Sequence, residues 1–169
     1  SEEIICNMMN DINIQIINTE SGQKTFLNGE DVSEDIRLPE VTKHVSPVSA
    51  IGCVRKKLVD LQRKLGMAGA VVLDGRDIGT VVFPDAELKI FLIASPDARA
   101  ERRAKELTEK GINFSVEEIK NQIIERDNFD SNRDNSPLRK AADAIEVDTS
   151  NLTIAEQCEI IINHAKQLI

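Results

Sequence analysis

Three short apolar runs constrain the fold of this 169-residue chain more than any other feature. They lie at residues 70–73, 89–93 and 144–147, and polar or turn-forming residues bound each of them. Runs of this kind are typical of parallel strands that are buried on both faces. Segments with helical periodicity lie between the runs. The alternation therefore predicts an α/β fold with a parallel sheet.

Residues 12–38 carry a different pattern, that of a small antiparallel unit. Isoleucines at every second position of 12–16 alternate with polar residues, which is the period of a half-buried strand. A returning strand is predicted at 24–27, and the Asn-Gly pair at 28–29 is a strong turn signal. Before this unit, residues 2–10 are expected to form the end of a helix.

Two helices are predicted from Ser-Pro pairs, which suit the start of a helix. Ser46 and Pro47 suit the N-cap and the first position of a helix that ends at Gly66. A second helix is predicted from Ser95 to Gly111. It carries many Arg and Lys side chains and little apolar surface, so we expect tertiary packing to hold it only weakly.

Two later helices begin with the pattern of a capping box, in which a hydroxyl side chain and a glutamate three residues on bond each other's backbone amides. The pairs are Ser115 with Glu118 and Thr153 with Glu156. The last helix is expected to bury one face. That face comprises Ile154, Cys158, Ile161, Ala165 and Leu168.

Composition excludes several classes of function. The net charge is −8 and the chain has no Trp or Tyr, so it lacks the basic face and the stacking platforms of a nucleic-acid-binding protein. No apolar stretch is long enough to cross a membrane. Cys6, Cys53 and Cys158 are isolated in sequence, and we expect three reduced, mostly buried thiols in a cytoplasmic protein.

The loop after the first apolar run is the first candidate for chemistry. Asp74 suits a carboxylate beside Mg²⁺, and Gly75 permits close approach to a ligand. Arg76 could clamp a phosphate, and Asp77 could accept a hydrogen bond from an amino group. Ligands gather at the carboxyl ends of parallel strands, which favours this interpretation. The structural alternative is a strand-to-helix loop with a capping aspartate.

A second candidate comprises Arg126, Asp130 and Arg133. Offsets of four and seven residues place all three on one helical stripe, where they could bind an anion. The alternative is a ladder of surface salt bridges, which contributes little to stability.

The basic helix and the first predicted helix supply two weaker candidates. Arg99, Arg102 and Arg103 could belong to a mobile lid that neutralises charge on a transferred phosphoryl group, or to a solvated charged helix. Ser46 could contact a ligand together with Arg55, or it could be a plain N-cap. No G-x-x-x-x-G-K-[ST] phosphate loop and no G-x-G-x-x-G motif occurs in the sequence.

Three segments, 27–32, 74–85 and 125–133, resemble bacterial cytidylate kinases in order and in spacing. The run Asp-Gly-Arg-Asp-x-Gly-Thr-Val-Val-Phe-Pro, which begins at Asp74, is highly specific for this family. The resemblance extends over nearly the whole chain.

The resemblance implies the α/β fold of a P-loop nucleoside monophosphate kinase, with a five-stranded parallel sheet. Residues 1–11 and 39–169 would form an incomplete kinase core whose lid spans about 95–115. Residues 12–38 would form a small antiparallel insertion that binds the phosphate acceptor, CMP.

The resemblance also implies which residues bind CMP. Ser46, Arg55 and Asp77 would surround the cytosine, and Asp130 would hold the ribose. The whole implied CMP site is Ser46, Arg55, Gly75, Arg76, Asp77, Arg126, Asp130 and Arg133. The implied catalytic groups are Arg76, Arg126, Arg133, Arg102, Arg103 and Asp74, and Arg99 belongs with Arg102 and Arg103 in the lid.

The implied reaction is in-line phosphoryl transfer from ATP to CMP or dCMP, with Mg²⁺ as the cofactor. No protein side chain would bind the metal directly, and Asp74 could contact it through a water molecule. Arginines and Mg²⁺ would offset the developing charge. We expect the complete enzyme to be a cytoplasmic monomer with no nucleic-acid or membrane partner.

The chain departs from the family pattern at the ATP site. The family's phosphate loop lies N-terminal to everything present here, together with a strand from the middle of the sheet. We therefore expect an incomplete fold without turnover, which self-associates or pairs with the missing segment. The alternatives are a natural non-catalytic nucleotide-binding module and a purely structural fragment that binds no ligand.

Overall fold

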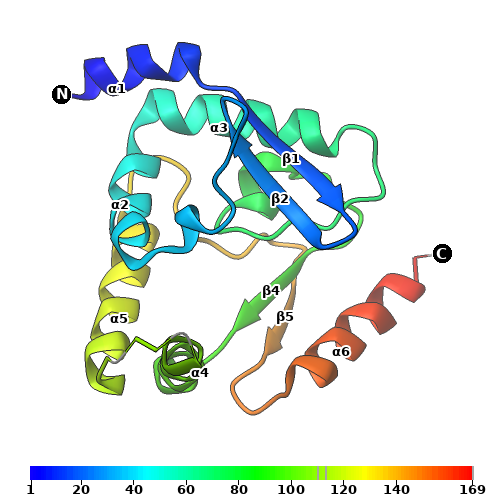
Figure 1. Cartoon of the computed structure of the whole chain (residues 1–169). Coiled ribbons are helices and arrows are strands. Elements are labelled where there is room, and N and C mark those ends of the chain that lie inside the picture. Colours follow the sequence, from blue (N-terminus) through cyan, green and yellow to red (C-terminus); the bar gives the residue numbers. More distant parts are fainter. Residues whose placement is uncertain (110, 113, 169) are drawn as a thin grey trace. The chain divides into compact units, whose positions relative to one another are not determined.

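The computed structural model describes residues 1–109, 111–112 and 114–168. The chain forms two compact units, Ser1–Gly69 and Ala70–Ile169. Each unit has its own sheet, and Figure 1 labels the helices and strands of both. Within the described residues, no helix has the length and apolar character needed to span a membrane.

The first unit contains the predicted antiparallel strands. The strands β1 (Ile14–Thr19), β2 (Gly22–Leu27) and β3 (Glu30–Asp31) lie in that order in one sheet. All neighbours pair antiparallel, as the sequence predicted. Between β2 and β3, Asn28 and Gly29 have φ values of 52° and 88°. This left-handed geometry suits an Asn-Gly turn and confirms that signal.

An ion pair joins two strands of this sheet. The Lys24 Nζ atom lies 2.8 Å from Asp31 Oδ2, and the Ser33 hydroxyl donates to Asp31 Oδ1. The hydrogen bond from Lys24, followed by those from Ser33, lowers the pKa of the Asp31 carboxyl to about 2. The pair therefore favours the charged carboxylate at neutral pH.

Helices form the rest of the first unit. They are α1 (Glu2–Met8), a 3₁₀ turn (Met9–Asp11), a second 3₁₀ turn (Asp35–Arg37), α2 (Pro39–Ala50) and α3 (Gly52–Gly66). The helix predicted over residues 2–10 and the stop at Gly66 are confirmed.

The predicted helix start at Ser46 is wrong. Ser46 and Pro47 lie inside α2, which begins at Pro39 instead, another proline that suits the first position of a helix. Pro47 lies inside α2, where it has no amide hydrogen to donate to the carbonyl of Lys43 one turn earlier, and the helix ends three residues later at Ala50. Ile51 is extended, with φ −67° and ψ 121°, and it separates α2 from α3.

A disulfide joins two helices of the first unit, which corrects the expectation of three reduced thiols. Cys6 of α1 and Cys53 of α3 are bonded, with their Cα atoms 5.7 Å apart. They are 47 residues apart in sequence, so spacing alone gives no sign of the pairing. Cys158 is free and exposed, rather than buried.

The second unit contains the parallel strands. The strands β4 (Ile90–Ile93) and β5 (Ile145–Asp148) pair in parallel, with Ile90 opposite Ile145. These strands confirm the prediction that the second and third apolar runs form parallel strands. The parallel sheet has two strands among the described residues, rather than the five that the resemblance implied.

The first apolar run is not a strand. Residues 70–73 have no regular structure, and Val71 and Val72 are 49% and 97% exposed. A parallel strand is held by hydrogen bonds to neighbouring strands, and no described strand pairs with this run. The apolar composition of the run therefore does not bury it.

Two helices form the best-packed part of the second unit, α4 (Pro96–Glu109) and α5 (Val116–Asn132). Ala100, Leu107 and Ile119 are 0%, 5% and 3% exposed and form its core cluster. The expectation of weak packing for the basic helix is therefore wrong, because Ala100 and Leu107 of this helix are buried together with Ile119 of α5. Lys110, inside the predicted helix, lies outside the described residues.

Helix starts in this unit follow the predicted caps. The Ser95 hydroxyl accepts from the Ala98 amide at 3.1 Å, at the start of α4. The capping boxes of Ser115 and Thr153 are both formed, and the latter opens α6 (Ile154–Lys166).

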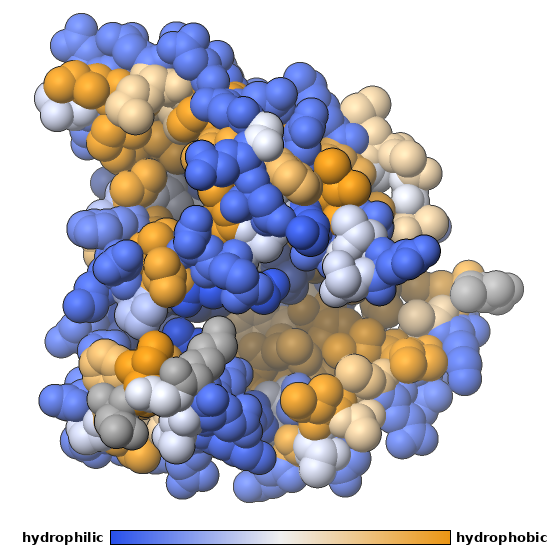
Figure 2. Space-filling view, in the orientation of Figure 1, coloured by the Kyte–Doolittle hydropathy of each residue, from blue (hydrophilic) through white to orange (hydrophobic). Residues whose placement is uncertain are grey.

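The predicted inner face of α6 is wrong at three of its five positions. Ile154, Cys158 and Leu168 are exposed, Ile154 by 80%. The half-buried residues of the helix are Gln157, Ile160, Ile161, His164 and Ala165. Figure 2 shows hydrophobic side chains exposed among hydrophilic ones on this face of the molecule.

Candidate active site

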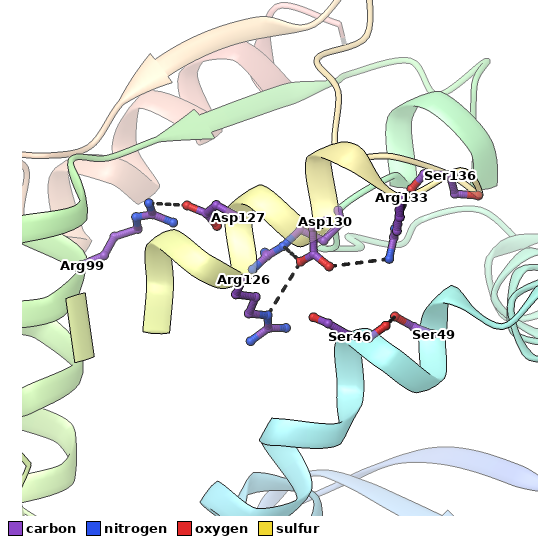
Figure 3. A network of polar contacts seen from close by, with 9 residues as sticks. Ser46, Ser49, Arg99, Arg126, Asp127, Asp130, Arg133 and Ser136 are labelled. Carbon is purple, nitrogen blue, oxygen red and sulfur yellow. Dashed lines mark hydrogen bonds and ion pairs between the residues drawn. The ribbon is translucent and has the colours of Figure 1, made fainter. Parts of the chain in front are cut away.

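One buried carboxylate gathers three arginines in the second unit. Asp130 is 2% exposed, and Arg76 Nε lies 3.1 Å from its Oδ2. Arg126 Nε lies 3.7 Å from Oδ2, and Arg133 Nη1 lies 3.8 Å from Oδ1. Figure 3 shows Arg126 and Arg133 turned toward Asp130. We call Arg76, Arg126 and Arg133 around Asp130 the arginine cluster.

The end of α5 positions most of this cluster. Arg126 and Asp130 are one turn apart on the helix. Arg133 is not on the helical stripe that the sequence predicted, because α5 ends at Asn132 and Arg133 is extended. Its guanidinium turns back toward Asp130 and also donates to the Ser136 carbonyl, at 2.8 Å from Nε.

Arg76 reaches Asp130 from the 74–80 loop. The loop leads into a π-helical turn, Ile78–Val82, in which the Asp77 carbonyl accepts from the Val81 amide at 2.9 Å. A Cβ atom on Gly75 would lie 2.9 Å from Ile78 Cγ1, so a glycine is required unless Ile78 shifts. Sequence spacing alone could not show that this loop and α5 meet, because Arg76 and Asp130 are 54 residues apart.

The two aspartates of this loop have different surroundings. Asp77 is 3% exposed, whereas Asp74 is exposed. Within the described residues, the Asp77 carboxylate does not cap the turn that follows it. The capping role, which was the structural alternative for this loop, therefore does not account for a buried carboxylate at this position.

The electrostatics of the arginine cluster favour an anionic ligand. Burial, and then the charge of Arg76, lower the pKa of the Arg126 guanidinium, while Asp130 and Asp127 raise it. Three guanidinium groups face one carboxylate at the centre of the cluster, so positive charge is in excess there. A phosphate group could accept charge-assisted hydrogen bonds from these arginines and offset their mutual repulsion.

The three arginines predicted for a lid have different partners. Arg99 Nη2 lies 2.5 Å from Asp127 Oδ2 on α5. Arg103 Nη1 lies 3.0 Å from Glu106 on its own helix. Arg102 donates to backbone carbonyls of the turn after β5, those of Thr149, Ser150 and Leu152. Their part in phosphoryl transfer stays a prediction.

The residues predicted to bind a base come from both units. Ser46 lies on α2, where its carbonyl accepts from the Ser49 hydroxyl at 3.0 Å, and Arg55 lies on α3 (Figure 3). Asp77 belongs to the second unit. Their common role therefore stays a prediction.

A groove of about 380 Å³ lies in the first unit, beside the disulfide of Cys6 and Cys53. Its walls include the side chains of Lys56 and Leu58. None of the predicted site residues lines this groove in the part of the chain that the structure describes.

Two contacts of the site were not predicted from the sequence. They are the ion pair of Asp127 with Arg99 and the hydrogen bonds from Arg133 to Ser136. Asp127 carried a signal, because it lies inside the 125–133 motif directly after Arg126. The carbonyl of Ser136 carried none, since every residue has one.

Among the described residues, no group of three or more His, Cys, Asp or Glu side chains could hold a metal ion. Mg²⁺ is commonly bound by one or two carboxylates together with substrate phosphates and water. The exposed Asp74 is of a type that suits such a site.

Arginine clusters of this kind are common in proteins that bind phosphate groups. Comparison with known proteins identifies the family. The family model for cytidylate kinase matches residues 1–167. The chain belongs to the cytidylate kinase family, a family of nucleoside monophosphate kinases.

Curated relatives agree with this family. The chain is 50% identical over 163 residues to the cytidylate kinase of Oceanobacillus iheyensis, covering 96% of this chain and 71% of that protein. It is 51% identical over 155 residues to that of Lactobacillus johnsonii, covering 92% and 67%. It is 53% identical over 148 residues to that of Enterococcus faecalis, covering 88% and 66%.

Proposed function

We propose that this chain carries the acceptor site of an enzyme that transfers a phosphoryl group from ATP to CMP or dCMP, giving CDP or dCDP. The observation that supports the proposal most is the convergence of three arginines on the buried Asp130. The family and its named relatives support the choice of cytidine nucleotide.

The arginine cluster would bind the phosphate of CMP. Arg76 and Arg126 have side chains that are 40% and 38% exposed, so they can be reached from solvent. Arg133 is almost fully buried, and it would brace the cluster from behind. Each charge-assisted hydrogen bond to the phosphate would contribute about 1.5–3 kcal/mol. Asp130 would orient the guanidinium groups and hold the ribose.

Asp77 would select the base, together with Ser46 and Arg55. Its buried carboxylate would accept a hydrogen bond from the exocyclic amine of cytosine. Uracil has a carbonyl at that position, so two acceptors would face each other with no proton between them. A buried mismatch of this kind costs about 1–3 kcal/mol or more. Gly75 would let the loop backbone approach the nucleotide.

The remaining groups would serve transfer from ATP. Mg²⁺ bound with ATP would offset negative charge on the transferred phosphoryl group. Asp74 could hold a water of that ion, and Arg102, Arg103 and Arg99 would belong to a lid over about 95–115. No general base is needed, because the acceptor phosphate is already largely ionised at neutral pH. Residues 12–38 would form the CMP-binding antiparallel insertion in the core formed by 1–11 and 39–169.

We further propose that these 169 residues bind CMP but do not turn it over, because they contain no G-x-x-x-x-G-K-[ST] motif to hold ATP. The second candidate is a non-catalytic nucleotide-binding module, which would bind CMP without phosphorylating it. We expect the whole enzyme to act as a monomer in the cytoplasm.

Three experiments test the proposed function. Calorimetry should show one saturable site for CMP on this chain, and Asp77→Ala should abolish it. Sequencing the gene upstream of Ser1 separates the two candidates, because a phosphate-loop motif there supports the kinase. A protein that includes that motif should phosphorylate CMP and dCMP much faster than UMP or AMP. Equal rates with UMP would refute the role of Asp77.

A further inference from the structure

The three arginines of α4 differ in what they can do, because each has different partners. Arg103 pairs with Glu106 three residues on, and both side chains are exposed by more than a third. Arg102 donates to three backbone carbonyls of the turn after β5, and a fourth hydrogen bond reaches the Thr149 hydroxyl at 3.5 Å. In this structure its guanidinium therefore anchors that turn, and it makes no contact with the arginine cluster that the described residues show.

Arg99 is the arginine that connects α4 to α5. Its Nη2 atom lies 2.5 Å from Asp127 Oδ2, and the two side chains are only 32% and 28% exposed. The Arg99 Nε atom is buried and has no hydrogen-bond partner among the described residues. The two helices that carry this ion pair are packed together through the buried side chains of Ala100 and Ile119.

Asp127 also belongs to the surroundings of the arginine cluster. It follows Arg126 and lies three residues before Asp130 on α5, and its charge raises the pKa of the Arg126 guanidinium, against the larger effects of burial and Arg76. Figure 3 draws Asp127 between Arg99 and the pair formed by Arg126 and Asp130. One carboxylate therefore touches the lid arginine and acts electrostatically on the cluster.

We propose that Asp127 is a positioning residue that holds the Arg99 guanidinium beside the arginine cluster, so that Arg99 joins it in binding the phosphate of the acceptor nucleotide. Arg102 anchors the turn after β5 instead. This inference rests on the proposed function, because it assigns Arg99 to the same phosphate.

The sign of the effect separates positioning from simple electrostatics. Removing a carboxylate near an anion site leaves more positive charge there, which by itself strengthens the binding of an anion. Releasing Arg99 from its position has the opposite effect, because a mobile arginine loses side-chain entropy when it binds. A purely structural role for Asp127 changes stability but has no effect on the affinity of the folded protein.

The test is calorimetric titration of the full 169-residue chain with CMP. The variants are Asp127→Asn and the matched control Glu106→Gln, which removes the same charge from the partner of Arg103. We expect Asp127→Asn to weaken CMP binding about 10-fold, which is the loss of one charge-assisted hydrogen bond at the low end of its range. Glu106→Gln should stay within about twofold of the wild type. Far-UV circular dichroism establishes that each variant is folded.

A double-mutant cycle tests whether Asp127 acts through Arg99. In an Arg99→Gln background, Asp127→Asn should cause no further loss of affinity. Unchanged or tighter CMP binding by Asp127→Asn, or additive losses in the cycle, would overturn the positioning role while the acceptor site stands. A wild-type chain that binds no CMP would overturn both. Asp127→Glu should restore part of the affinity, and a failure to do so would count against an ion pair as the cause.

Discussion

Replacing Asp130 with asparagine tests the arginine cluster directly. Asn has nearly the same shape as Asp but carries no charge, so the substitution removes the one anion at the centre of the cluster. Arg76, Arg126 and Arg133 lie within 3.1–3.8 Å of the Asp130 carboxylate, and Asp130 is 2% exposed. The substitution should therefore leave mutually repelling guanidinium groups in a partly buried site.

The expected loss of unfolding free energy depends on how deeply Asp130 and its arginine partners are buried. Breaking a buried ion pair by removing one partner typically costs about 3–5 kcal/mol. Water screens part of the repulsion here, because Arg76 and Arg126 are 40% and 38% exposed. We therefore expect Asp130→Asn to lower the free energy of unfolding by about 2–4 kcal/mol, a large part of the 5–15 kcal/mol typical of a folded protein.

The assay is urea unfolding followed by far-UV circular dichroism, because the chain has no Trp or Tyr for fluorescence. The control is Asp134→Asn, which removes the same charge from an exposed carboxylate nearby. Inorganic phosphate should stabilise the Asp130→Asn variant more than the wild type, since it supplies the missing anion. A loss below about 0.5 kcal/mol for Asp130→Asn, or the same loss for both variants, would show that the Asp130 charge does not hold the arginine cluster together.

Three further predictions follow from the two units. Replacing Cys6 and Cys53 with serine should lower the free energy of unfolding by about 4 kcal/mol in the chain-entropy description of a crosslink, as measured by urea unfolding. Leu107→Ala should cost about 2–5 kcal/mol in the same assay, because Leu107 is 5% exposed inside the core cluster. The pKa of Asp31 lies at about 2, below its ordinary value, so its stabilising contribution is complete above about pH 4. That contribution should be lost as the pH falls from about 4 to 2, and an NMR titration of Lys24→Met should show the Asp31 pKa return toward 3.8.

Each of these predictions has a control. Cys158→Ser removes a free, exposed thiol and should leave unfolding unchanged. Val72→Ala truncates a side chain that is 97% exposed, so it should cost far less than Leu107→Ala. If Cys158→Ser lowered the free energy of unfolding as much as the loss of the disulfide, the bond between Cys6 and Cys53 would be contradicted. If Val72→Ala cost as much as Leu107→Ala, the burial of Leu107 would be contradicted. An Asp31 pKa that does not move in Lys24→Met would show that the ion pair is not its main cause.

Local signals in the sequence predicted much of the secondary structure. The capping boxes of Ser115 and Thr153 and the Asn-Gly turn at 28–29 were all confirmed. Such features depend on hydrogen bonds and backbone angles of neighbouring residues, so a short stretch of sequence determines them.

Features that depend on distant partners were predicted poorly. The 70–73 run has the composition of a buried strand but lacks a described neighbour to pair with, and Val72 is exposed. Pro47 suits a helix start, but the competing proline at Pro39 takes that position. The packing of Ala100 in α4 depends on how closely α5 approaches, which composition does not reveal.

The same division applies to the site. The motifs at 74–85 and 125–133 identified Arg76, Arg126 and Asp130 as candidates, and the structure brings these residues together. The position of Arg133 beyond the end of α5 needed the structure, because its contact depends on an extended backbone after the helix.

The affinity of this chain for CMP relative to cytidine tests most directly whether the arginine cluster is a phosphate site. The two ligands differ only in the phosphate, and two charge-assisted hydrogen bonds at the low end of their range contribute about 3 kcal/mol. Calorimetry should therefore show CMP binding at least about 100-fold more tightly than cytidine. Equal affinities for the two ligands would contradict the account.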